Sequence, residues 1–108
     1  INIKVYKMKK LIILFLASFL FGNINSFLEK ASVAIKNGNY EEALIHVNKA
    51  QNENLKNPDL YRMEALIFEM LDEPKKAKKA WKKCLKYSNE KNMINEAKIH
   101  IQTLSEKK

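Results

Sequence analysis

The side chains that could do chemistry in this chain are few and widely spaced. His46 and His100 stand far apart, without the paired His or Cys spacing that binds zinc. Glu41 and Glu42 are adjacent, so on a helix they point about 100° apart instead of converging. Negative charge in the first turn of a helix is favoured by the helix dipole, which is sufficient reason for both residues. Cys84 is the only cysteine, which favours a small buried residue over a reactive thiol. We therefore predict no enzyme activity, no metal and no cofactor.

A run of lysines is the strongest charged feature. Alanine, tryptophan and cysteine interleave with it at helical spacing, so the lysines would surround the inward stripe of one helix. They can form a solvated face whose stems cover the core, or bind anionic lipid or an acidic partner. Nucleic acid is not expected, because the one aromatic residue within the run, Trp81, belongs to the inward stripe and none is left for base stacking. This basic patch consists of Lys75, Lys76, Lys78, Lys79, Lys82, Lys83 and Lys86.

The net charge is concentrated at the two places where lysines cluster. The chain has 108 residues, enough for one small domain, and a formal charge of +8. Four lysines precede Leu11, and from Phe27 onward the net charge is only +4. The body of the protein is thus moderately basic, and the whole-chain charge overstates the case for a polyanionic partner.

The segment MKKLIILFLASFLFGNINS, Met8 to Ser26, has the layout of a secretory signal peptide: a basic start, an apolar run, then small and polar residues. The run is about half of the roughly 20 apolar residues that cross a bilayer. A buried core helix or a short uncleaved anchor is the alternative. We assign residues 1–25 to a signal region with Met8 as the true start. The protein is expected to be exported, periplasmic or secreted, or membrane-anchored if the signal stays.

After the signal region, apolar residues recur at helical spacing and turn residues divide the chain into helix pairs. The first pair is predicted over 26–36 and 40–52, with Gly38 in the break. Ser26 and Glu29 would cap its first helix if the signal is cut after Gly22, and not if it is cut after Ser26.

A second pair and a single last helix follow. The second pair is predicted to open at Pro58, to turn at Asp72 and to continue over 74–87. The last helix lies within 90–108, with charges between its apolar positions. Its apolar residues are Met93, Ile94, Ala97, Ile101 and Leu104.

The two helix pairs repeat each other at an offset of 34 residues. Matched positions are small, aromatic or otherwise apolar: Phe27 with Tyr61, Ala31 with Ala65, Ala34 with Phe68, Ala43 with Ala77, Val47 with Trp81 and Ala50 with Cys84. This pattern resembles the tetratricopeptide repeat. It departs from the family in three ways: Lys30 and Glu64 replace a leucine, Asp72 replaces the turn glycine, and the closing prolines are missing or displaced.

The resemblance implies an all-α fold. Two hairpins, 26–57 and 58–89, would form a right-handed α-solenoid, and the last helix would cover its open end. Ala31 against Ala43, and Ala65 against Ala77, would let the two helices of each hairpin touch.

The resemblance also implies a binding groove on the concave side, lined mostly by first helices. Methionine and leucine dominate there, and such flexible apolar side chains suit an amphipathic helix or an extended peptide. The set that holds a C-terminal carboxylate in some members of the family is not matched, since no asparagine accompanies Arg62 and Lys36. The alternative is a groove filled by the last helix or by a second copy of the chain. The expected groove residues are Leu28, Ile35, Arg62, Met63, Leu66, Met70, Met93 and His100.

Two functions from different classes remain. The first is a non-catalytic interaction module of the bacterial cell envelope that binds a peptide or helix of a partner protein in the groove. The second is a membrane-surface or assembly factor that uses the lysine-rich helix 75–86. Self-association of the chain is a further expectation, because two repeats make a short stack.

Overall fold

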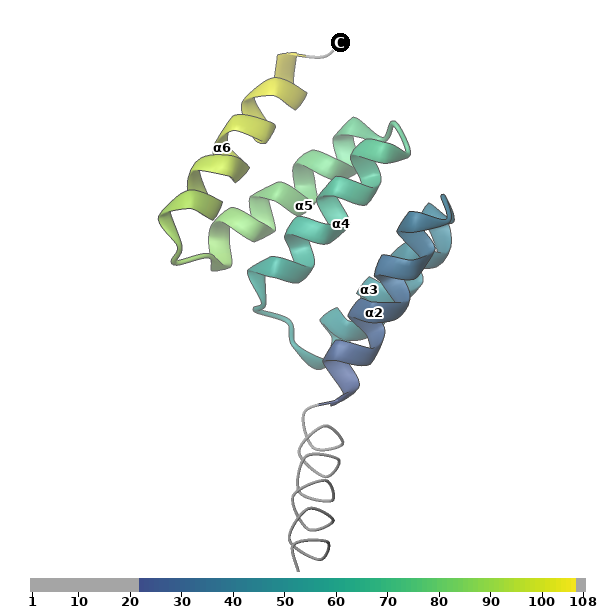
Figure 1. Ribbon diagram of the computed structural model, residues 1–108. Coiled ribbons are helices and arrows are strands. Elements are labelled where there is room, and N and C mark those ends of the chain that lie inside the picture. Colours follow the sequence, from purple (N-terminus) through teal and green to yellow (C-terminus); the bar gives the residue numbers. More distant parts are fainter. Residues whose placement is uncertain (1–21, 107–108) are drawn as a thin grey trace, which may run out of the picture.

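The computed structural model describes residues 22–106, which form five α-helices and no strands (Figure 1). The predicted all-α class is confirmed. Residues 1–21 of the expected signal region, 1–25, lie outside the described residues. None of the described helices is long and apolar enough to cross a membrane. The helices are α2 (Gly22–Lys36), α3 (Tyr40–Glu53), α4 (Pro58–Met70), α5 (Pro74–Tyr87) and α6 (Lys91–Glu106).

The first hairpin joins α2 to α3 through a left-handed turn. Gly38 has φ 76°, a conformation that costs glycine little because it has no Cβ. The Asn39 amide donates back to the Ala34 carbonyl at 2.8 Å and closes the turn. Ala31 and Ala43 are fully buried in one cluster, so the small residues lie where the two helices pack.

The second hairpin joins α4 to α5 in the same manner. Asn57 caps α4 by accepting a hydrogen bond from the Asp59 amide at 3.0 Å. Asp72 turns the chain with φ 55°, at the position equivalent to Gly38. Ala65 and Ala77 are fully buried in the core of this hairpin. In both hairpins the alanine pair sits in the shared core, as the repeat predicted.

The last helix packs on the second hairpin. Ala97 and Leu104 of α6 join the cluster that holds Trp81 and Cys84 of α5. The far side of α6 is mostly polar, although Ile99 is 63% exposed. The second hairpin is therefore covered by α6 on the side away from α3.

Two residues that the sequence analysis left out of the core lie in it. Leu60 is fully buried and Ile67 is 2% exposed. Ile67 belongs to the cluster of the first hairpin, so α4 contributes to the cores on both of its sides. This contact, with Met63 and Leu71 packed beside it, joins the two hairpins.

The predicted helix start at Ser26 is wrong for the uncut chain, whereas a cap at Ser26 after cleavage stays a prediction. α2 begins at Gly22, so Ser26 lies inside the helix and not at its start. A cap satisfies amide groups only where a helix begins, and here the preceding turn already supplies carbonyl partners. The S-x-x-E pattern carries no information about what precedes it.

Candidate functional site

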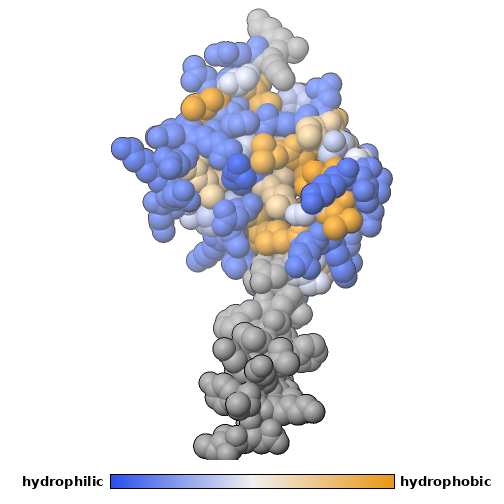
Figure 2. Space-filling view, viewed as in Figure 1, coloured by the Kyte–Doolittle hydropathy of each residue, from blue (hydrophilic) through white to orange (hydrophobic). Residues whose placement is uncertain are grey.

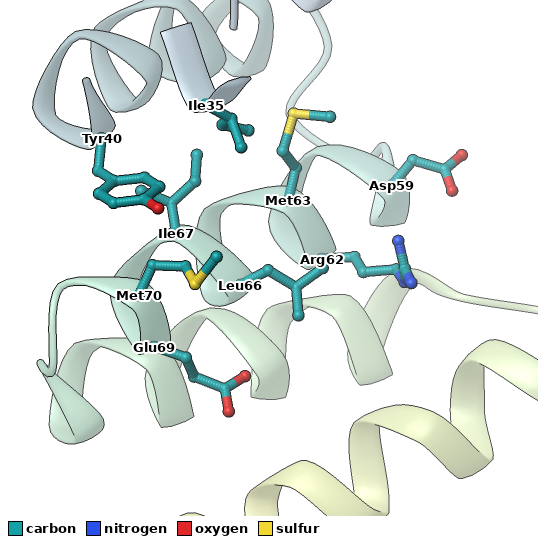
Figure 3. A pocket seen from close by; sticks show the side chains of 9 residues that line it. All are labelled: Ile35, Tyr40, Asp59, Arg62, Met63, Leu66, Ile67, Glu69 and Met70. Atoms are coloured by element: carbon teal, nitrogen blue, oxygen red, sulfur yellow. The ribbon is translucent and has the colours of Figure 1, made fainter. Parts of the chain in front are cut away.

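A groove of about 530 Å³ opens between the first hairpin and α4. Figure 2 shows apolar side chains gathered on this face, with hydrophilic residues around them. Figure 3 shows the side chains of α2, α3 and α4 that surround the groove. They are Ile35, Tyr40, Asp59, Arg62, Met63, Leu66, Ile67, Glu69 and Met70.

The exposed face of α4 provides most of the groove. Met63, Leu66 and Met70 follow one another at spacings of three and four residues, so they share one side of the helix. Met70 is 61% exposed, so its side chain is open to solvent at this surface. Ile67 lies behind them and is held in the core. The groove therefore has a fixed floor and flexible walls.

The ends of the groove differ in chemistry. Tyr40 and Met70 stand at one end, while Asp59 and Arg62 stand at the other (Figure 3). The apolar stretch from Arg62 to Met70 is about 12 Å long, the length of two helical turns. This arrangement can bury a row of apolar side chains and orient a charged group at one end. It brings together no nucleophile and base.

Arg62 is turned toward α6 and forms a two-pronged ion pair with Glu96. Nε lies 2.7 Å from Oε2, and Nη2 lies 2.9 Å from Oε1. The hydrogen bonds to Arg62 lower the pKa of Glu96, and those to Glu96 raise the pKa of Arg62. The pair ties α4 to α6 across a gap where few backbone atoms meet.

Glu69 makes a second connection between α4 and α6. Trp81 Nε1 donates to Glu69 Oε2 at 2.8 Å, and His100 Nδ1 lies 2.9 Å from the same oxygen. The His100 ring stacks on Trp81 with centroids 4.3 Å apart. Glu69 thus satisfies the polar atom of a fully buried indole and holds α6 in place at the same time.

The structure brings together five of the eight expected groove residues: Ile35, Arg62, Met63, Leu66 and Met70. Leu28 lines a separate shallow hollow on α2, and Met93 lines one beside Arg62 and Glu96. His100 is occupied by Glu69 and Trp81. No residue of α6 lines the groove, so the last helix does not fill it.

Sequence reasoning missed residues that shape this surface. Tyr40, Asp59 and Ile67 line the groove without having been named for it. The Arg62–Glu96 pair had a signal, because the two residues are 34 apart, which is the repeat offset. Equivalent positions on successive first helices lie side by side in a stack, so opposite charges there predict a bridge.

The seven lysines of the basic patch all lie on α5. Lys76 pairs with Glu73 at 2.8 Å and also lies over the Phe68 ring. Lys83 and Lys86 lie 5.5 and 5.3 Å from the ring centres of Tyr61 and Tyr87. Their stems therefore cover aromatic surface while six of the seven side chains stay exposed.

The remaining side chains that could react, Cys84 and His46, are buried or half-buried in the fold. Burial raises the pKa of the Cys84 thiol to about 11, which keeps it protonated at neutral pH. His46 is half-buried on α3, with Nε2 3.6 Å from Glu42. Within residues 22–106 no group of three His, Cys, Asp or Glu side chains could hold a metal ion.

No protein-family model matches the chain, and no curated protein matches it. The function must therefore be argued from the groove and the charged surfaces alone.

Proposed function

We propose that this protein is a non-catalytic interaction module of the tetratricopeptide type, in which two helix hairpins and a terminal helix form a short α-solenoid. The repeat offset, the buried alanine pairs and the left-handed turns at Gly38 and Asp72 support this assignment. Its task is to bind a segment of a partner protein in the groove between the first hairpin and α4.

One observation carries the proposal: an open groove with an almost wholly apolar lining. Apolar side chains that stay partly open to water are unfavourable, and their accumulation marks interaction sites. Met63, Leu66 and Met70 form such a row, and methionine adapts its shape to more than one ligand.

The groove selects the chemistry of the partner. Its length fits about two turns of an amphipathic helix, with apolar residues at spacings of three and four toward α4. Asp59 at one end is exposed and unpaired among the described residues, so a lysine or arginine of the partner fits there. A groove that contacts only about two helical turns of a partner buries little surface, which favours weak, reversible binding.

The proposed location is the bacterial cell envelope. The basic start and apolar run between Met8 and Ser26 support export through a signal peptide. Partners would then be other exported or membrane-anchored proteins that carry exposed amphipathic helices.

The experiment is crosslinking capture of partners from an envelope extract, followed by mass spectrometry, with wild type and Met63→Asp/Leu66→Asp. Two carboxylates in the groove should abolish capture, because they would be desolvated without a counter-charge. The matched control is Ile45→Asp/Ile99→Asp, which changes two exposed apolar residues outside the groove. Capture of the same proteins by the groove variant, or equal loss in the control, would show that the groove is not the binding site.

A further inference from the structure

The outer side of α5 carries a continuous array of positive charge. At 100° per residue the seven lysines occupy about 160° of the helix surface, opposite the buried stripe of Ala77, Ala80, Trp81 and Cys84. Lys75, Lys79, Lys82 and Lys86 follow one another at i, i+4, i+7 and i+11, over about 16 Å. These seven lysines are called the lysine face below.

The fold leaves this charge uncompensated. Of the seven lysines, only Lys76 has an ion pair within the described residues. Three carboxylates on the adjoining helices α4 and α6 have other partners: Glu64 binds Gln51, Glu69 binds Trp81 and His100, and Glu96 binds Arg62. Lysines at i and i+4 also repel one another, so the array costs stability that a few glutamates would have restored.

The shape of the lysine face separates it from a peptide site. Its lysines line none of the hollows named above in the described residues, so no cavity or fixed acceptor is available to fit a particular side chain. Flexible ammonium groups on a convex helix suit a target whose negative charge is spread over a plane. The phosphates of a bilayer surface have that distribution.

We propose that the lysine face binds the surface of a bilayer that contains anionic phospholipids, through contacts of the lysine ammonium groups with lipid phosphates. Charge complementarity carries this inference, and it does not depend on what the groove binds. The groove belongs to α2, α3 and α4, whereas the lysine face belongs to α5, so both surfaces can be occupied together.

The test compares the full-length protein with Lys75→Gln/Lys79→Gln/Lys82→Gln/Lys86→Gln in sedimentation with phosphatidylcholine vesicles, with and without phosphatidylglycerol. Zwitterionic vesicles give the baseline, including any contribution from the apolar N-terminal run. The control is Lys30→Gln/Lys36→Gln/Lys49→Gln/Lys56→Gln, which removes the same charge from exposed lysines of the first hairpin and the loop after it. Trp81 fluorescence verifies that each variant is folded.

Each lysine near an anionic surface contributes about fivefold to partitioning, so the α5 variant, which lacks four, should lose roughly 600-fold of the anionic-vesicle binding. The control variant should lose far less, and wild-type binding should collapse between low and physiological salt. Equal binding of wild type to both vesicle types, or equal losses in the two variants, would overturn the proposal. If the α5 variant instead loses only retention on soluble polyglutamate, the face recognises an acidic polypeptide and the lipid assignment is wrong.

Discussion

The ion pair between Arg62 and Glu96 allows a direct test of what stabilises the docking of α6. Arg62→Gln, Glu96→Gln and the double variant form a double-mutant cycle, which isolates the energy of the pair from the loss of each side chain. α6 shares its apolar core with the second hairpin, so the side-chain links to α4 should contribute measurably to its docking.

The geometry sets the expected size of the coupling. Two short charge-assisted hydrogen bonds would be strong if buried, but the Arg62 and Glu96 side chains are 41% and 30% exposed. Solvent screening reduces such pairs to about 1 kcal/mol. We expect each single variant to lower the free energy of unfolding by about 1–2 kcal/mol, with a coupling energy of about 1 kcal/mol.

Urea unfolding followed by tryptophan fluorescence provides the assay. Trp81 is the only tryptophan, is fully buried, and stacks on His100 of α6, so its emission reports on the docking of that helix. A coupling energy below about 0.3 kcal/mol would refute the reasoning, because the pair would then be an exposed contact without structural effect.

The same pair predicts a pH dependence with a definite sign. Arg62 lowers the pKa of Glu96 in the folded state below its ordinary value of 4.5. The stabilisation is therefore complete above pH 4.5 and is lost as the pH falls through the lowered pKa. Wild type should lose its advantage over Glu96→Gln in that acidic window. An advantage that stays constant from neutral pH to below this window would contradict the assignment.

Two further predictions concern the turns and the thiol. Gly38→Ala should destabilise the fold by about 1 kcal/mol through its left-handed backbone alone, since an added Cβ meets nothing within 4 Å. Asp72→Gly at the equivalent turn should change stability by less than about 0.5 kcal/mol, because aspartate tolerates this conformation. Thermal unfolding of both turn variants measures the two effects, and equal effects would contradict this difference between Gly38 and Asp72. Cys84 should react with a thiol reagent at pH 8 only after urea unfolding, and rapid labelling of the folded protein would contradict its burial.

Helix existence and most helix bounds could be predicted from the sequence. The predicted starts of α3, α4 and α5 agree with the structure, because Gly38, Pro58 and Pro74 act on the backbone locally. The alanine positions were also predictable, since only small residues permit the close approach that a repeating pattern implies.

The core between the hairpins, the start of α2 and the groove lining could not be predicted, because they depend on how helices pack and on the chain beyond each local pattern. Whether Ile67 or Phe68 enters the core between the hairpins depends on the rotation of α4 about its axis. The start of α2 depended on the chain before Ser26. Three of the eight expected groove residues lie elsewhere for the same reason. The sequence predicts which helix face is apolar, but Leu28, Met93 and His100 are separated from the groove by how the helices stack.

The two sides of α4 differ because equivalent repeat positions carry different chemistry. Leu28, Arg62 and Glu96 occupy one such position on α2, α4 and α6. Leu28 offers no carboxylate, so Arg62 bonds only toward α6, and the α2 side of α4 keeps methionine and leucine without polar partners. The contacts of Arg62 with Glu96 and of Glu69 with Trp81 and His100 link α4, α5 and α6, whereas the groove opens between α4 and the first hairpin. A ligand that fills the groove therefore contacts both sides of that junction and should stabilise the packing of Ile67 there.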